Sequence, residues 1–225
     1  MSHIPWHLKN IRAFIYIGLV IAIIAVALSC FVGEPDMTVA WVGARELYGL
    51  WALALLVCSM LPGPINYVMP WFPLKAHLVL GRRALGISGF VMACLHVVCY
   101  LGPTLVRNWR DIFGSGNLWS AGLAIGILMI IDMGILAFSS TNGAVRKMGP
   151  KQWKKWHRTV YLLLPITLIH AIFLGADFGV NRGPDVKSEP DAGALIGMSI
   201  LSACWLTLFL LRKYQIRVAP KLLKK

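Results

Sequence analysis

Residues 84–102 read ALGISGFVMACLHVVCYLG, an apolar run with one imidazole, His96, in its second half. Its length approaches the ~20 residues that an α-helix needs to cross a membrane. The apolar residues are continuous and do not alternate with period two, which favours a helix over a barrel strand. An imidazole at membrane depth is costly and usually marks a cofactor, a proton path or a contact between helices. This stretch therefore predicts a membrane-spanning helix and makes His96 a candidate site residue.

Five further apolar stretches accompany this one. The composition agrees with them, because 58% of the 225 residues are hydrophobic and only 14% are charged. Such values are typical of a chain whose solvent is lipid. We predict an all-α integral membrane protein, a six-transmembrane-helix bundle that forms a single domain over residues 1–225. The predicted spans are residues 12–32, 43–61, 84–102, 118–139, 158–175 and 192–211.

Basic residues gather in the segments that six spans would place on one side. If both termini share that side, it carries 17 of the 22 lysines and arginines and no acidic residue. The opposite side carries five basic and eight acidic residues. Because an excess of Lys and Arg marks the cytoplasmic side, both termini are predicted to be cytoplasmic. Topology and anionic lipid thus explain the net charge of +13, and no nucleic-acid partner is expected.

The five cysteines lie within or at the ends of apolar stretches and form no CxxC or CxxCH pattern. This disfavours a covalently attached c-type haem and a disulfide framework, and we expect the thiols to act as small packing residues. We also expect no flavin- or nucleotide-binding domain within these 225 residues. Any reductant is therefore expected to come from the lipid phase or from a separate protein.

Two histidines fall at the same depth in their spans. His96 lies fourteen residues after Arg82, and His170 lies thirteen residues after His157, both counted from the basic flank. At about 1.5 Å per residue, both rings are expected roughly 20 Å from the inner boundary. Neutral imidazole is a good iron ligand, and two axial nitrogens complete the coordination of a haem. We predict that His96 and His170 bind one haem iron toward the outer side, with a proton relay or a polar contact between helices as alternatives.

A second set of residues lies toward the inner side. Arg82 and His96 share a helix face, because fourteen residues are close to four turns. His157 and His170 are thirteen residues apart and lie about 140° from a common face on an ideal helix. Either a kink at Pro165 or irregular winding at His157 must therefore reorient one ring. We predict an inner haem bounded by His157, with Arg82 opposite it or near its propionates.

The sequence also resembles a known family. It resembles the ferric-reductase-type transmembrane family, and within it the haem-binding membrane subunits of the bacterial periplasmic methionine sulfoxide reductase system. The similarity extends over roughly residues 45–175. It is carried by Arg82-Arg83, Leu85-Gly86, Leu95-His96, the run Ala137-Phe138-Ser139-Ser140-Thr141, Arg146-Lys147, Gly149, Trp153, His157, Val160-Tyr161 and His170.

The resemblance implies a multi-pass b-type cytochrome of the bacterial inner (plasma) membrane. Members of that group pass electrons from membrane quinol or a cytoplasmic flavin reductase to a periplasmic, molybdopterin-containing methionine sulfoxide reductase subunit. The matching positions imply that His96 and His170 hold the outer haem b, and that His157 belongs to an inner haem with Arg82 nearby. FMN is also associated with the family. The resemblance leaves open whether FMN binds and whether one or two haems are present.

Other polar and aromatic residues lie in or near the spans, and two of them, Arg45 and Asp132, have two interpretations each. Arg45, at the outer start of the second span, is predicted either to neutralise propionates of the outer haem or to act as a snorkelling interfacial arginine. Asp132, in the inner half of the fourth span, is interpreted as a hydrogen-bonded carboxyl that joins helices, in preference to a proton-uptake group. Ser139, Ser140 and Thr141 are expected to bond backbone carbonyls. An interfacial aromatic belt is expected from Trp41, Trp109, Trp119, Trp153 and Tyr214.

Three classes of function fit these features. The first is an electron-transfer subunit that serves a periplasmic reductase. The second is a stand-alone transmembrane metal reductase that delivers electrons to ferric ions, with the acidic segment 177–191 gathering cations at the outer face. The third is a non-redox, proton-coupled transporter that uses the histidines and Asp132. A reduced-minus-oxidised optical spectrum separates the third class from the others, because a transporter has no b-type bands.

Overall fold

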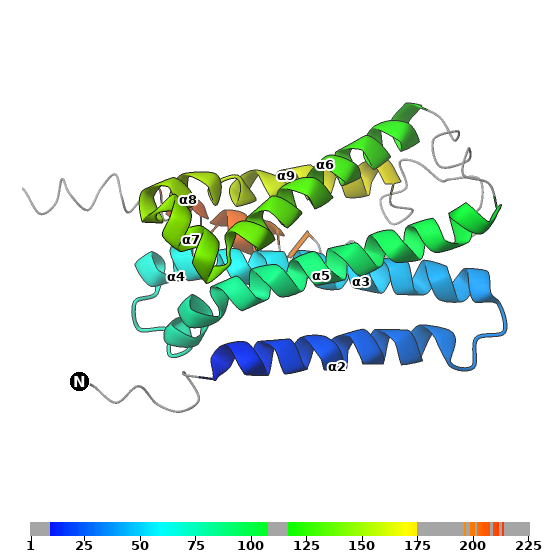
Figure 1. The fold of residues 1–225 in the computed structure, drawn as a ribbon, viewed down its shortest axis with the longest axis horizontal. Helices are drawn as coiled ribbons and strands as arrows, with labels where there is room; N and C mark the ends of the chain where they lie inside the picture. Colours follow the sequence, from blue (N-terminus) through cyan, green and yellow to red (C-terminus); the bar gives the residue numbers. More distant parts are fainter. Residues whose placement is uncertain are drawn as a thin grey trace, which may run out of the picture.

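A computed structural model describes residues 10–107 and 117–174, together with residues 196, 199–200, 202–207, 209–211 and 213. Every element in this part of the chain is a helix. The long helices lie side by side along the long axis of the molecule (Figure 1). They are α2 (Ile11–Phe31), α3 (Met37–Met60), α5 (Lys75–Arg107), α6 (Asn117–Ser139) and α9 (Val160–Leu174), with the short helices α4 (Pro62–Val68), α7 (Asn142–Met148) and α8 (Pro150–Trp156).

Five helical stretches in the described residues are long and apolar enough to cross a membrane. This confirms the predicted all-α membrane architecture. The predicted sixth span, residues 192–211, lies partly outside the described residues. Its described part includes Trp205, whose ring packs against Tyr161 of α9 with the ring centroids 6.0 Å apart. Six spans and cytoplasmic termini therefore stay predictions.

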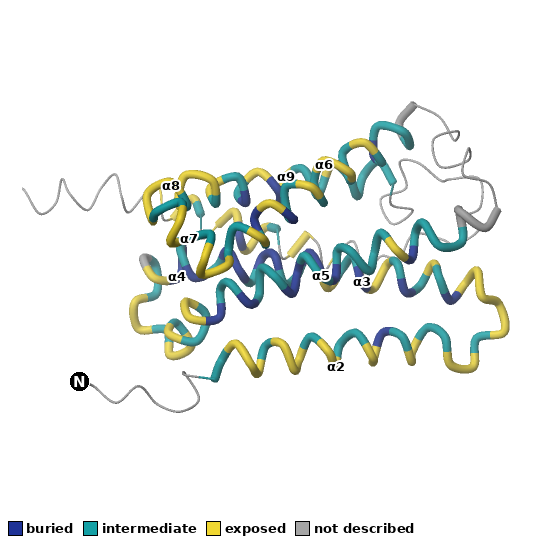
Figure 2. The backbone as a smooth tube through the Cα atoms, in the orientation of Figure 1, coloured by how far each residue is buried: buried dark blue, intermediate teal, exposed yellow. Residues whose placement is uncertain are grey.

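The long helices pack as two pairs with α2 on the outside. One pair is α3 with α5, the other is α6 with α9, and α2 lies along the α3–α5 pair (Figure 1). Small buried residues on α3, Ala40, Ala44 and Ala52, let neighbouring backbones approach closely. The hydroxyl of Tyr48 on α3 donates a hydrogen bond to the carbonyl oxygen of Ile23 on α2 at 3.2 Å. In Figure 2 the buried positions concentrate on α3, whereas α2 is exposed along much of its length.

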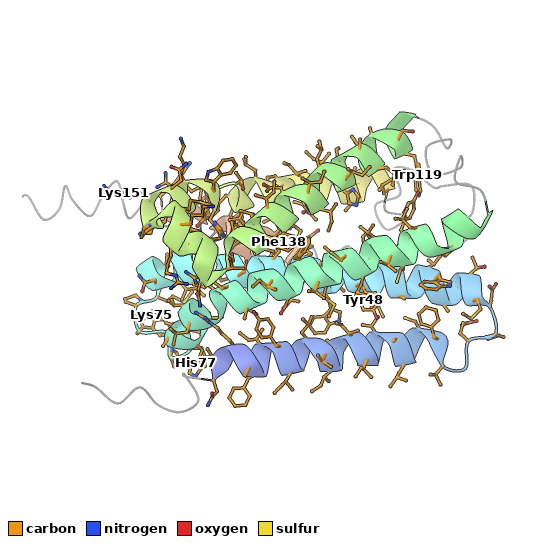
Figure 3. All side chains as sticks on the ribbon, viewed as in Figure 1. Tyr48, Lys75, His77, Trp119, Phe138 and Lys151 are labelled. Carbon is orange, nitrogen blue, oxygen red and sulfur yellow. The ribbon has the colours of Figure 1, made fainter. Side chains whose placement is uncertain are left out.

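The basic segments meet at one end of the bundle. Helices α4, α7 and α8 lie there together with the start of α2 (Figure 1). Figure 3 places Lys75 and Lys151 at this end and Trp119 at the opposite end. Lys75 and Lys151, which belong to two of the predicted inner segments, thus lie at the same end of the described helices. We call this basic end the inner end and the opposite one the outer end.

The helices of the third and fifth spans differ from the predicted bounds at their inner ends. Helix α5 begins at Lys75, nine residues before the predicted span 84–102, and Pro73 lies just before this start, where a proline disfavours a longer helix. Most of the segment between the second and third spans is also ordered, since α4 follows directly on α3. Helix α8 ends at Trp156, and α9 begins at Val160, two residues after the start of the predicted span 158–175. His157 therefore lies in the turn that separates two helices.

Packing between α9 and its neighbours offers a matched test of the bundle. Leu164 is 2% exposed and belongs to a core cluster with residues of α3 and α6, whereas Leu162 on the same helix is 61% exposed. We expect Leu164→Ala to lower the free energy of unfolding in detergent by about 2 kcal/mol. This is below the usual loss for a buried leucine in water, because the lipid-like surroundings are as apolar as the core. Leu162→Ala is the control and is expected to unfold like the unaltered protein.

Candidate functional site

The structure brings together the two histidines that the sequence placed at one depth. His96 lies on α5 and His170 on α9, and thus on different helix pairs. The centroids of the two imidazole rings are 6.4 Å apart, and the ring planes are inclined by 71°. The two rings therefore meet where the α3–α5 pair faces the α6–α9 pair.

Each ring is fixed by a hydrogen bond to a main-chain carbonyl. The Nδ1 atom of His96 lies 2.8 Å from the carbonyl oxygen of Arg45 on α3, and the Nδ1 atom of His170 lies 2.9 Å from that of Gly122 on α6. A carbonyl oxygen only accepts, so both Nδ1 atoms carry the proton and donate it. In a neutral imidazole the Nε2 atom then keeps its lone pair. Both rings are thus held in the tautomer that a metal ligand requires.

The spacing of the rings fits a metal between them. A metal–nitrogen bond is about 2.0 Å, so two imidazole rings that bind one metal through their nitrogens have centroids roughly 6 to 7 Å apart. The distance in this structure is 6.4 Å. The donor set also fits, because two neutral imidazoles with bonded Nδ1–H groups form a usual axial pair for a haem in an electron carrier.

Arg45 contributes to the site through its backbone. Its carbonyl accepts the hydrogen bond from His96, and its guanidinium Nη2 lies 3.6 Å from a carboxylate oxygen of Glu46. The guanidinium is one-quarter exposed. The predicted interaction with haem propionates stays a prediction, and the carbonyl contact is one that the sequence did not indicate.

A second candidate site lies at the inner end. A small cavity of about 70 Å³ is lined by residues of α3, α5, α6, α8 and α9. His157 and Arg82, which the sequence analysis grouped, both line it. The volume accommodates a few water molecules, so a porphyrin there requires side chains to move. The lining consists of Leu56, Ser59, Arg82, Arg83, Gly86, Ile87, Met133, Leu136, Ala137, Ser140, Trp153, His157, Val160 and Leu163.

Both ring nitrogens of His157 lie within hydrogen-bond distance of a partner. Its Nδ1 atom lies 3.2 Å from the carbonyl oxygen of Trp153, and its Nε2 atom lies 3.0 Å from the hydroxyl oxygen of Ser140. The Ser140 hydroxyl also lies 2.8 Å from the carbonyl oxygen of Leu136, which agrees with the predicted backbone bonding of this serine. Residues 157–159 form a turn between α8 and α9, so the chain from His157 to His170 is not one continuous helix. Of the two explanations offered, irregular winding at His157 is present.

Trp153 is a site residue that the sequence analysis placed in the interfacial belt. Its ring lies beside that of His157, with the centroids 4.0 Å apart and the planes tilted by 31°, and the guanidinium carbon of Arg83 lies 5.4 Å from the Trp153 ring centroid. Arg83 also donates a hydrogen bond from Nη1 to the side-chain oxygen of Asn142 at 3.1 Å. The spacing of four residues between Trp153 and His157 was the available signal, because residues i and i+4 are neighbours on a helix.

The remaining predicted residues fall as follows. Asp132 accepts a hydrogen bond from the Thr159 hydroxyl at 3.3 Å, which joins α6 to the turn before α9 as the preferred interpretation required. Ser139 bonds the carbonyl oxygen of Leu136, whereas the Thr141 hydroxyl accepts a bond from the amide of Ala144 and begins α7. Two aromatic residues and one acidic segment lie outside the described residues: Trp109, Tyr214 and 177–191.

Comparison with known proteins agrees with this geometry. Residues 48–168 match the family described as Ferric reductase like transmembrane component. The match covers more than half of the chain. The chain belongs to this family. The matched region runs from α3 to α9 and contains His96 and His157, and it ends two residues before His170.

Three relatives illustrate how far the similarity reaches. One is the protein-methionine-sulfoxide reductase heme-binding subunit MsrQ of Caulobacter vibrioides, 32% identical over 58% of this chain and 59% of its own length. Another is MsrQ of Rhodospirillum rubrum, 29% identical over 56% of this chain and 58% of its own length. The third, the magnetosome protein MamZ of Magnetospirillum gryphiswaldense, is 29% identical over 55% of this chain and 18% of its own length. The alignments thus span less than two thirds of each relative.

Family membership and the apolar helices together define the location. The family is a transmembrane one, the described residues include five candidate spans, and the relatives are bacterial. The protein is therefore a multi-pass protein of the bacterial inner membrane, as the sequence predicted.

Proposed function

We propose that this protein is a haem-b electron-transfer subunit that carries electrons across the inner membrane to a periplasmic methionine sulfoxide reductase. The observation that carries the proposal is the facing pair His96 and His170, with ring centroids 6.4 Å apart and both Nδ1 atoms bonded to carbonyls. The relatives described as heme-binding subunits support the same cofactor.

The haem-binding residues follow from the ring chemistry. His96 and His170 would hold the iron through Nε2, and the carbonyls of Arg45 and Gly122 keep each ring in the tautomer that this requires. A haem held by two imidazoles supplies one-electron transfer, with no open position for an oxygen ligand. The neighbouring helices partly bury the pair, and this burial and the hydrogen bonds to the rings would set the reduction potential of a bound haem.

Electrons enter at the inner end in this proposal. His157, Trp153, Arg82 and Arg83 form a polar group there, and apart from Ser59 and Ser140 the rest of the cavity lining is apolar. Two guanidinium groups suit an anionic or electron-rich partner, such as the propionates of a second haem, a quinol head group or a flavin. Quinol or a cytoplasmic flavin reductase is the proposed donor. A molybdopterin-containing reductase subunit is the proposed acceptor at the outer end.

The experiment for this function uses the purified full chain expressed with excess haem. A reduced-minus-oxidised spectrum with b-type bands is expected, together with oxidation of the reduced protein by a co-expressed periplasmic molybdoenzyme. A colourless protein would exclude an electron carrier and leave the transporter. Rapid oxidation by ferric chelates, with none by the molybdoenzyme, would support the stand-alone metal reductase instead.

The charge at Arg45 gives a prediction about the outer haem. The contact with His96 uses the main chain, so Arg45→Ala is expected to keep the haem. Loss of a positive charge near the iron stabilises the ferric form and is expected to make the midpoint potential more negative. Glu46→Gln removes the opposite charge of the pair and is expected to shift the potential the other way. A spectropotentiometric titration measures both shifts, and loss of haem from Arg45→Ala would show that the guanidinium holds the haem itself.

A further inference from the structure

The carbonyl oxygens that accept hydrogen bonds from the two histidines share a local pattern. Arg45 lies four residues before Gly49 on α3, and Gly122 lies four residues before Gly126 on α6. In an α-helix the Cα–Cβ bond tilts toward the N-terminus, so the side chain at position i+4 covers the carbonyl of residue i. A glycine at i+4 leaves that carbonyl open to a group from another helix.

Both glycines are in contact range of the imidazole rings that bond these carbonyls. A Cβ atom built on Gly49 would lie 2.9 Å from Nδ1 and 3.2 Å from Cε1 of His96. One built on Gly126 would lie 2.7 Å from Cε1 and 3.1 Å from Nδ1 of His170. These separations are shorter than van der Waals contact between such atoms. In both cases the same two atoms of the ring, Nδ1 and Cε1, occupy the place of the missing side chain.

The rings have little freedom to yield. Each imidazole is tied to its carbonyl through Nδ1, so a methyl group at the glycine would push the ring at the point where it is bonded. The rings would have to turn about the bond to the Cβ atom, which breaks the hydrogen bond and moves Nε2. Movement of Nε2 at one ring changes its distance from the opposite ring, since the two face each other across 6.4 Å.

We propose that Gly49 and Gly126 are positioning residues that seat His96 and His170 against the carbonyls of Arg45 and Gly122 and so fix the axial ligands of the haem. This inference rests on the proposed function and names the residues that aim its ligands. We call each glycine, together with the carbonyl four residues before it, a seat: Gly49 with Arg45 on α3, and Gly126 with Gly122 on α6. The two seats are built alike on different helices, so the same arrangement positions each of the two rings. Each seat acts on a single ring, and neither glycine touches the iron.

The chain offers a control for each seat. On α3, a Cβ atom at Gly43 would lie 3.6 Å from the sulfur of Cys30, and on α6, a Cβ atom at Gly134 would lie 3.5 Å from the ring of Phe90. Both are ordinary contacts. Gly43→Ala and Gly134→Ala therefore change the same helices by the same methyl group without entering the space of a histidine.

The test compares these four alanine variants in the full chain, purified in detergent after haem-replete expression. Haem per chain, the low-spin electron paramagnetic resonance signal and the midpoint potential are measured for each. We expect Gly49→Ala and Gly126→Ala to lose at least twofold in haem per chain and to shift the resonance of the haem that remains. Its potential is expected to become more positive, because an imidazole that loses its Nδ1–H bond is a weaker donor to ferric iron. The two controls are expected to match the unaltered protein.

The outcomes distinguish this inference from the proposed function. If the unaltered protein binds no haem, the proposed function fails. If it binds haem between two imidazoles and the two seat variants are indistinguishable from it in resonance and potential, the inference on the glycines is overturned. If neither seat variant accumulates while both controls do, the glycines serve helix packing alone, and the inference is overturned as well.

Discussion

His170→Ala is expected to abolish the outer haem. The variant removes one of two axial nitrogens, and the ring it removes is tied to α6 by the bond from Nδ1 to the carbonyl of Gly122. Alanine leaves a hole where the imidazole stood, and no other described histidine is close enough to replace it. His96→Ala is expected to give the same loss, because the iron depends on both rings equally. Haem per chain, measured by pyridine haemochrome against protein, checks this result.

The loss is expected to be large and specific. His77 lies on the same helix as His96, nineteen residues nearer the inner end, which is about 28 Å along the axis. His77→Ala therefore removes an imidazole from this chain without disturbing the pair, and it is expected to keep the full haem content. Full retention of haem in both His96→Ala and His170→Ala would refute the assignment of the ligands.

The angle between the rings adds a spectroscopic signature to this prediction. The imidazole planes are inclined by 71°, close to perpendicular. Perpendicular axial imidazoles leave two iron d orbitals nearly equal in energy, which gives a strongly anisotropic low-spin ferric signal. We expect the unaltered protein to show such a signal in electron paramagnetic resonance, and both histidine variants to lack it. A signal typical of parallel imidazoles would mean that the rings turn when haem binds.

The depth of the two histidines was predictable because the rise of a helix is constant. Counting fourteen residues from Arg82 and thirteen from His157 put both rings at one level, and the structure places them in contact range. This held although α5 begins nine residues before the predicted third span and α9 begins two residues after the start of the predicted fifth span. Such differences leave the histidines in register, since a helix extended or shortened at one end does not move the residues within it.

The partners of the rings were less accessible to sequence reasoning. The acceptors for His96 and His170 are main-chain carbonyls, and a carbonyl carries no sequence signature. The one readable sign was Gly122 four residues before Gly126, a spacing of small residues that lets membrane helices approach. Gly49 stands without such a partner on α3, so it becomes visible only when α5 is placed against it.

The position of His157 also needed the structure. The sequence required that His157 or His170 turn away from ideal helical phase and offered two causes, Pro165 or irregular winding. The surroundings of His157 include a residue from outside its own segment, since the Trp153 ring beside it lies against the guanidinium of Arg83 on α5. Such packing is tertiary, and residue spacing along one chain segment does not determine it.

His157→Ala is expected to cause a partial loss of haem while the signal of the outer pair persists. His157 lines the inner cavity with Arg82 and lies in the turn before α9, thirteen residues before His170, so its removal leaves the outer ligands in place. If an inner haem is bound through His157, haem per chain falls by no more than half. Reduction of the outer haem by quinol or by a flavin reductase is also expected to slow at least tenfold, since the inner group is the proposed point of entry. Stopped-flow spectroscopy measures this rate.

A Ser140→Ala variant distinguishes two roles of His157, a haem ligand or a contact between α6 and the turn before α9. The Nε2 atom of His157 lies 3.0 Å from the Ser140 hydroxyl, and this nitrogen cannot bond the serine and a metal at once. If His157 is a ligand, the Ser140 contact competes with it, and Ser140→Ala should keep or raise the haem content. If His157 only joins α6 to the turn before α9, Ser140→Ala should reproduce the effects of His157→Ala. Ser139→Ala is the matched control, because its hydroxyl bonds the carbonyl of Leu136 and lies outside the cavity lining. We expect the first pattern, since two arginines beside a single imidazole suit an anionic cofactor better than a simple bond between helices.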